Sequence, residues 1–292
     1  MRTLDSHISL ALNHYGNALE QHFLCDVVAY IGQIHPVFIQ PFLEFIEAVA
    51  SKKPDDQPFP KRLVLVINTP GGVAETVEKM VEIIRHHYSE VYFVVPNTAM
   101  SAGTIFCMSG DKIYMDYSSS LGPIDPQVPA HDGRLVPALG YIDKVNEFID
   151  KAHCGGGLSD AELIMLKGLD LAMLSRYEQA CELSISLLKM WLVKYKFKDW
   201  KEHRTNNPGS QVTEGEKQER AEEIAKLLSD NKIWHSHGRM IGIKTLSEDL
   251  KLEIEDYTND AQLRNTIRTY SELLTEYVDK QQVPVFMHSC RG

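Results

Sequence analysis

Apolar runs in the first part of the chain predict four buried strands. Residues 62–70 read RLVLVINTP and residues 90–96 read EVYFVVP, with β-branched and aromatic side chains at consecutive positions. Residues 26–34 (DVVAYIGQI) and 111–116 (DKIYMD) have a similar apolar character. Continuous runs of this kind are typical of parallel strands that are buried on both faces.

Segments with helical spacing separate these strands. Apolar residues recur every three or four positions over residues 3–22, 35–50 and 71–87. Residues 100–110 (MSAGTIFCMSG) predict a short helix of small side chains. The resulting β-α-β-α-β-α-β order implies right-handed crossovers and a parallel sheet. We therefore predict an α/β fold.

The second half of the chain is predicted to be mainly helical. Residues 141–200 have helical spacing that is broken by HCGGG at 153–157. Residues 205–219 are polar and rich in turn formers, which predicts a mobile surface loop. Residues 232–246 (KIWHSHGRMIGIKTL) predict a turn and strand region, and residues 260–280 predict a closing helix.

Composition and charge exclude several classes of protein. The chain has 292 residues, of which 43% are hydrophobic and 24% are charged, as in ordinary folded proteins. Its 30 Lys and Arg residues against 40 Asp and Glu residues give a formal net charge of −10. Such a chain repels polyphosphate, so nucleic acid is not expected as a partner.

The cysteines and the hydropathy of the chain indicate the cellular compartment of the protein. The five cysteines are scattered, odd in number and without a CxxC pair, which argues against disulfides or a structural zinc and for a reducing compartment. The N-terminal segment lacks the apolar run of a signal peptide, and no apolar stretch is long enough to span a bilayer. We therefore expect a cytoplasmic protein with no metal site and no membrane span.

Three loops follow consecutive predicted strands, at the carboxyl ends where open α/β sheets bind ligands. The first reads NTPGG at residues 68–72. Gly71 and Gly72 allow backbone N–H groups to face a substrate oxygen at a helix N-terminus. A tight turn between strand and helix is the alternative interpretation. The spacing does not match the phosphate-binding pattern GxxxxGK[ST].

The second loop reads TAMSAGT at residues 98–104 and places Ser101 where a strand meets a helix. Its small neighbours leave room for an acyl group to approach the hydroxyl, as in a nucleophile elbow, although the GxSxG string is absent. The structural alternative is a serine that simply caps the helix. Thr98 and Thr104 supply further hydroxyl groups nearby.

The third loop reads SSSLGPIDPQ at residues 118–127 and is too rigid and apolar for a linker. We predict that it forms one wall of a substrate groove. The residues predicted to line this groove are Gly71, Gly122, Pro123 and Asp125.

Taken in order, NTPGG, MSAGT and SSSLGPIDPQ resemble the Clp/crotonase-fold serine peptidases, and most closely the signal peptide peptidase and serine dehydrogenase proteinase group. The resemblance covers residues 26–127, and more weakly residues 233–255. It implies a Clp/crotonase-like core of repeated ββα units with an added helical arm and a C-terminal helix. The implied divisions are an N-terminal helix (1–25), a peptidase domain (26–256) and a C-terminal helix with a tail (257–292).

The activity that this resemblance implies is ATP-independent peptide cleavage through an acyl-enzyme on Ser101. The oxyanion hole would consist of the backbone N–H groups of Gly72 and Ala102. Relatives bind peptide as an added strand and assemble into rings, so a peptide or unfolded protein substrate and a homo-oligomer are expected. No cofactor is expected, because no GxGxxG follows a strand and the group's name implies no redox chemistry.

The general base has several candidates. Signal peptide peptidases use a lysine forty to fifty residues after the serine, which selects Lys144 and Lys151 here. The best alignment places Tyr141 at the lysine position, so the chain departs from that pattern. His235 and His237 lie in the later segment that approaches the active site in Clp peptidases, and either one is an alternative base.

Two other functions remain open from the sequence. A crotonase-type acyl-CoA enzyme would use the same oxyanion hole on a thioester and would not need Ser101. A scaffold of the same fold would have lost its base and would have no catalytic function. The MSAGT string favours the peptidase.

Overall fold

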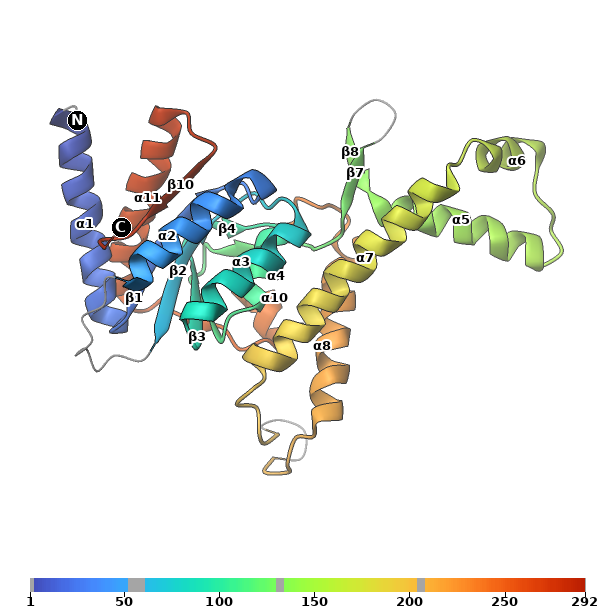
Figure 1. Ribbon diagram of the computed structural model, residues 1–292. Helices are drawn as coiled ribbons and strands as arrows, with labels where there is room; N and C mark the ends of the chain where they lie inside the picture. The colour runs from blue at the N-terminus through green and yellow to red at the C-terminus, as the bar shows by residue number, and fades with distance from the viewer. Residues whose placement is uncertain (1–2, 52–60, 130–133, 204–207, 292) are drawn as a thin grey trace.

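The computed structural model of the protein describes residues 3–51, 61–129, 134–203 and 208–291. Neighbouring strands of its central sheet pair in parallel, except at one edge where the last strand runs antiparallel to the first. The four strands predicted from apolar runs are confirmed. From edge to edge the six strands are β10 (Val285–His288), β1 (Asp26–Gly32), β2 (Arg62–Asn68), β3 (Glu90–Val95), β5 (Lys112–Met115) and β9 (Glu255–Asp256) (Figure 1).

Helices cover both faces of this sheet, which explains why its central strands are apolar on both faces between their ends. On β2, Leu65 packs in one core cluster with α2 and α3, whereas Val66 packs in a second cluster with α1 and α11. Both side chains are fully buried. Side chains alternate between faces along a strand, so a strand covered on both sides has no solvent-facing position. The helices are α1 (Thr3–Phe23), α2 (Ile39–Ser51), α3 (Ala74–His87) and α11 (Ala261–Gln281).

A second layer of short pairings crosses the carboxyl ends of the main strands. Its largest element is the parallel pair of β4 (Thr98–Ala99) and β6 (Ser120–Leu121), which follow β3 and β5 along the chain. The strands β1, β2, β3 and β5 thus each lead into a second extended segment, and the sheet with its helices confirms the α/β fold predicted above. The isolated bridges of this layer join Ile34 to Gly72, Thr69 to Ala99, and Leu121 to Ile241.

A helical arm extends from the sheet. Figure 1 shows α5, α6 and the beginning of α7 projecting away from the core, while the end of α7 returns to it beside α8. The buried residues of α7 all lie in its second half, from Cys181 to Trp191. The arm begins with the hairpin β7 (Gln127–Pro129) and β8 (Leu135–Pro137) and contains α5 (Ala138–His153), α6 (Asp160–Lys167), α7 (Leu171–Trp191) and α8 (Glu214–Ser229).

Two predictions for the second half need correction. The loop predicted over residues 205–219 ends earlier, because Thr213 and Glu216 form a capping box that starts α8 at Glu214. Residues 205–207 lie outside the described residues. The strand predicted within residues 232–246 is replaced by two short helices, and only Ile241 pairs as in a strand. These helices are α9 (Asn231–Trp234) and α10 (Ile243–Glu248).

No helix among the described residues is both long enough and apolar enough to cross a membrane.

Candidate active site

Ser101 occupies a strained turn between β4 and α4 (Ala102–Met108). Its backbone angles are φ 52° and ψ −116°, a conformation that residues with a side chain rarely adopt. Ser101 is half-buried, whereas every residue of α4 is buried. Within the described residues its hydroxyl has no hydrogen-bond partner, and it does not cap the helix. Strain of this kind persists only where the surroundings enforce it, and it is concentrated at functional sites.

Thr69 holds the beginning of this turn. The backbone N–H of Met100 donates to the carbonyl of Thr69 at 3.0 Å, and the N–H of Thr69 donates to the carbonyl of Thr98 at 3.0 Å. The Thr69 hydroxyl accepts the N–H of Gly71 at 3.0 Å. One buried threonine therefore connects the glycine loop after β2 to the serine turn.

Thr104 holds the other side of the turn. Its Oγ1 lies 2.8 Å from the carbonyl oxygen of Ala99 and 2.9 Å from that of Gly122. The same oxygen accepts the N–H of Gly122 at 2.9 Å. In the sequence, Thr104 stands out only as a further hydroxyl near Ser101. Thr104 is completely buried, and its hydrogen bonds connect the serine turn to the segment after β6.

Glycine is sterically required at both positions of the loop after β2. Gly71 has φ 100° and Gly72 has φ 150°. A Cβ atom on Gly71 would lie 2.6 Å from the carbonyl oxygen of Met100, and one on Gly72 would lie 1.8 Å from that of Ile34. Both contacts are with backbone, which cannot move aside. The loop therefore depends on close backbone approach rather than on turn propensity alone.

Two backbone N–H groups beside the serine are available to a ligand. The neighbouring backbone groups of the loop are paired, since Gly71 O accepts the N–H of Ile34 at 2.9 Å and Val73 N–H donates to Ile34 O at 3.0 Å. By contrast, no described residue accepts a hydrogen bond from the N–H of Gly72 or of Ala102. These are the two donors that the resemblance implies for an oxyanion hole.

The segment after β6 brings a buried carboxylate to a histidine. Gly122 lies against the serine turn, because a Cβ on it would be 2.6 Å from Cε of Met100. Three residues later, Asp125 is 1% exposed. Its Oδ1 lies 2.8 Å from Nδ1 of His237, and its Oδ2 accepts the side-chain N–H of Gln127 at 2.8 Å. The sequence predicted Asp125 on the wall of a substrate groove. In the structure its carboxylate contacts His237, a candidate base.

The two histidines of this segment differ in their surroundings. His235 is exposed and ends α9 with a left-handed backbone, at φ 60°. His237 is half-buried on Asp125, with its side chain 27% exposed.

The candidate lysines lie on the arm. Lys144 forms an ion pair with Glu147 at 2.8 Å, and Lys151 forms one with Glu162 at 2.7 Å. Their side chains are 55% and 45% exposed, so neither has the burial that a lysine base requires. Figure 1 shows α5 well separated from α4. Tyr141, at the aligned lysine position, packs its ring on Tyr177.

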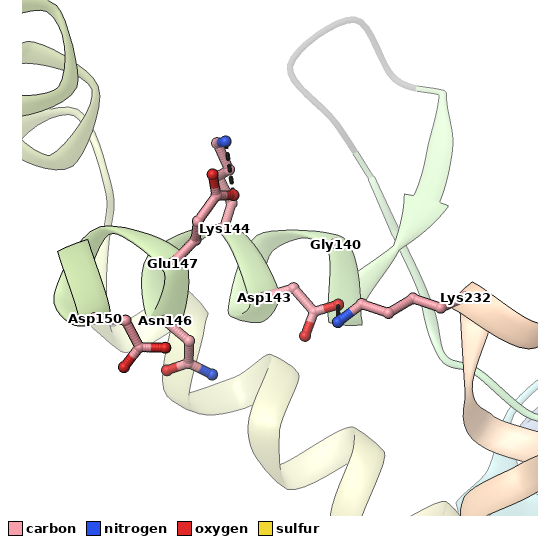
Figure 2. A pocket seen from close by; sticks show the side chains of 7 residues that line it. All are labelled: Gly140, Asp143, Lys144, Asn146, Glu147, Asp150 and Lys232. Atoms are coloured by element: carbon pink, nitrogen blue, oxygen red, sulfur yellow. Dashed lines mark hydrogen bonds and ion pairs between the residues drawn. The ribbon is translucent and has the colours of Figure 1, made fainter.

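An open pocket surrounds Lys144, but its lining is acidic. Figure 2 shows Asp143 paired with Lys232 of α9, at 2.9 Å, on the side of α5 that faces α9. Asn146, Glu147 and Asp150 complete the lining with Gly140. None of the residues that line this pocket belongs to the serine turn or to the glycine loop.

Cysteines do not compete with Ser101 as nucleophiles near this site. Burial raises the pKa of the Cys107 thiol on α4. Burial, and next the charge of Asp125, raise the pKa of Cys181 to about 11. Because the thiolate is the reactive form, both thiols are inert at neutral pH.

Comparisons with known proteins agree with this geometry. Residues 36–200 match the family described as ClpP-like SDH-type serine proteinase. Two uncharacterized proteins of Methanocaldococcus jannaschii are similar, one 36% identical over 89 residues (30% of this chain and 28% of the relative) and one 35% identical over 75 residues (26% and 24%). The chain thus spans about a quarter of the length of these curated relatives.

Solved structures of the 1510-N membrane-bound stomatin-specific protease are also similar. A serine-to-alanine mutant aligns with a TM-score of 0.45 and 14% identity, covering 78% of this chain and 77% of that one. A lysine-to-alanine mutant in complex with a substrate peptide aligns with a TM-score of 0.32 and 21% identity, covering 41% and 55%. On the family match, which spans more than half of its length and includes Ser101, the chain belongs to the ClpP-like SDH-type serine proteinases.

Proposed function

We propose that this protein is an ATP-independent serine peptidase that cleaves peptides through an acyl-enzyme on Ser101. The observation that carries the proposal is the strained serine turn beside two backbone N–H groups, those of Gly72 and Ala102, from which no described residue accepts a hydrogen bond. A serine held in a sharp strand-to-helix turn presents its hydroxyl to an incoming carbonyl. The family match supports the same activity.

The oxyanion hole in this proposal consists of the N–H groups of Gly72 and Ala102. Ala102 begins α4, so its N–H has no partner inside the helix. Gly72 is fixed by its bridge to Ile34. Donors that are already in place cost no reorganisation when negative charge develops on the carbonyl oxygen, and removing one such donor typically slows the reaction by about 10²–10³.

A peptide or an unfolded protein is the proposed substrate. Gly71 and Gly122 lie on either side of the serine turn, and both approach Met100 closely. The neighbouring Gly72 is exposed, and its backbone is open to an extended peptide, which can add to the short second layer as a further strand. ATP independence is supported by the lack of a GxxxxGK[ST] string in the sequence.

We further propose that the protein is cytoplasmic and forms a homo-oligomer. Support for a reducing compartment comes from the five cysteines, all of which are free thiols. Support for self-association comes from α6 on the arm, which buries none of its own residues and exposes Leu163, Ile164 and Met165. Clustered apolar side chains of this kind are typical of interaction surfaces.

The proposal is tested by labelling the purified protein with a fluorophosphonate probe and measuring its intact mass. We expect one adduct on the wild type and none on Ser101→Ala. Ser89→Ala, which changes an exposed serine at the other end of the sheet, is the matched control and should label like the wild type. A wild type that gains no adduct, or a Ser101→Ala variant that still gains one, would contradict the proposal.

A further inference from the structure

Strand β10 fixes the carboxyl end of β1. The two strands run antiparallel, and their pairing at this end joins Gly32 to Val285. One residue further along, the N–H of Gln33 donates to the carbonyl of Pro284 at 3.4 Å. Strand β10 therefore holds the chain up to the residue that precedes Ile34.

Gly32 allows this close approach between the two strands. Its φ is 128°, in the region that favours glycine. A Cβ atom on Gly32 would overlap the carbonyl oxygen of Pro284 and would lie only 2.9 Å from Cα of Val285. Both contacts are with backbone, so a side chain at this position would push the end of β1 away from β10.

Ile34, two residues after Gly32, holds the glycine loop that precedes α3. Its N–H donates to the carbonyl of Gly71 at 2.9 Å, and its own carbonyl accepts the N–H of Val73 at 3.0 Å. Gly72 lies between these two bonds and is bridged to Ile34. Because Ile34 is completely buried, the direction of the Gly72 N–H depends on where β1 places Ile34.

The glycine loop has a second support that does not depend on β10. The hydroxyl of Thr69, directly after β2, accepts the N–H of Gly71 at 3.0 Å. This bond fixes the beginning of the loop, whereas Ile34 bonds to the residues on both sides of Gly72. A shift at the end of β1 would therefore turn the Gly72 N–H while the beginning of the loop stays in place.

We infer that Gly32 is a positioning residue for the oxyanion hole, through which β10 sets the direction of the Gly72 N–H. This inference rests on the proposed function of Ser101. Gly32 acts through Ile34 and not by contact with the substrate. An oxyanion donor is effective only at about 3 Å from the oxygen that gains charge, and a misplacement of about 1 Å can slow a reaction by about 10²-fold.

The test measures inactivation by a fluorophosphonate probe, whose phosphoryl oxygen gains charge as Ser101 attacks and takes the place of the peptide oxyanion. It separates the maximal rate constant, kinact, from the probe concentration that gives half of it, KI. We expect Gly32→Ala to lower kinact by about 10–10²-fold with little change in KI, since removing a whole oxyanion donor typically costs about 10²–10³.

Gly16→Ala is the matched control. A Cβ atom on Gly16 of α1 would overlap Sγ of Cys290, at the opposite end of the segment that carries β10. This variant disturbs the attachment of the same segment, but it should keep the wild-type kinact. Urea denaturation of both variants separates a shift of the oxyanion hole from a general loss of stability.

Val285→Ala decides the question if Gly32→Ala does not fold. Val285 pairs with Gly32 and packs against the main core, so removing its methyl groups loosens β10 at this point. We expect kinact to fall by at least about threefold. Cys290→Ala, which truncates a side chain at the far end of the segment, should leave kinact unchanged.

The inference is overturned if every folded variant among Gly32→Ala and Val285→Ala keeps the wild-type kinact. It is also overturned if the control at Gly16 or Cys290 lowers kinact as much as the variant with which it is paired. In both cases the proposed function of Ser101 stands. If the wild type itself does not label, the proposed function fails.

Discussion

Gly71 lies directly against Ser101, so that a Cβ atom on the glycine would be only 2.9 Å from the Cβ of the serine. The two residues are on different loops, one after β2 and one after β4. Their contact means that the glycine loop and the serine turn form a single unit. A change in one loop must displace the other.

We expect Gly71→Ala to lower kinact, the maximal rate constant for inactivation by the fluorophosphonate probe, by at least tenfold. The same change should destabilise the fold. The added methyl group would meet the backbone of Met100 at 2.6 Å, in a loop whose φ of 100° already disfavours a side chain. Gly140→Ala is the control, since a Cβ there meets nothing within 4 Å. In α5 this control should stabilise the protein by up to about 1 kcal/mol. Equal kinetics for Gly71→Ala and the wild type would contradict the contact.

We expect Ser101→Gly to be more stable than Ser101→Ala by about 1–3 kcal/mol, although neither variant should label. Alanine keeps the Cβ atom that is strained at φ 52°, whereas glycine relieves it. Urea denaturation measures the difference. At Ser89, which has no positive φ, the order should be reversed, with glycine the less stable by roughly 0.5–1 kcal/mol. If alanine is the more stable residue at position 101 as well, the serine turn is unstrained.

We expect Thr104→Val to destabilise the protein by about 1–3 kcal/mol and to lower kinact. Valine has nearly the same shape but leaves the buried N–H of Gly122 without its acceptor. The serine turn would also lose its connection to the segment that carries Asp125. Thr266→Val removes an exposed hydroxyl that donates to the carbonyl of Gln262, and should change the free energy of unfolding by less than about 0.5 kcal/mol. If Thr104→Val changes the free energy of unfolding as little as Thr266→Val does, the Thr104 hydroxyl does not hold the serine turn.

Acid should weaken the attachment of the C-terminal strand through His288. Burial lowers the pKa of His288 from its ordinary 6.5 to about 4, so protonation favours the unfolded chain. This contribution to stability is complete above pH 6.5 and is lost as the pH falls towards 4, by at most about 1.4 kcal/mol per pH unit. Nδ1 of His288 lies 2.7 Å from the hydroxyl oxygen of Tyr270, so protonation of the ring also disturbs a contact between β10 and α11.

His288→Gln should therefore flatten the loss of stability between pH 6.5 and pH 4.5 in urea titrations. His86→Gln, at an exposed histidine of α3, is the control and should keep the wild-type slope. If both variants follow the wild type throughout this range, His288 does not contribute to the acid sensitivity.

Much of the fold could be predicted because its signals are local. The four central strands appear as continuous apolar runs, since strands covered on both faces have no polar side. The serine turn was also visible, because small residues around Ser101 follow directly after a strand. The helices within residues 232–246 were missed, since they are short and depend on local caps such as the Asp230 side chain, which accepts the N–H of Lys232.

The sequence by itself determined the α/β architecture, the glycine loop and the position of Ser101, because hydrophobic periodicity and steric demands act between neighbours in the chain. Only the tertiary structure decided which ionisable side chains meet. Asp125 and His237 are 112 residues apart, and they are brought together by the pairing of β4 with β6 and of Leu121 with Ile241. The same folding places Lys144 on an arm that points away from the sheet. Such distances depend on packing and backbone hydrogen bonds between remote segments, which no local pattern encodes.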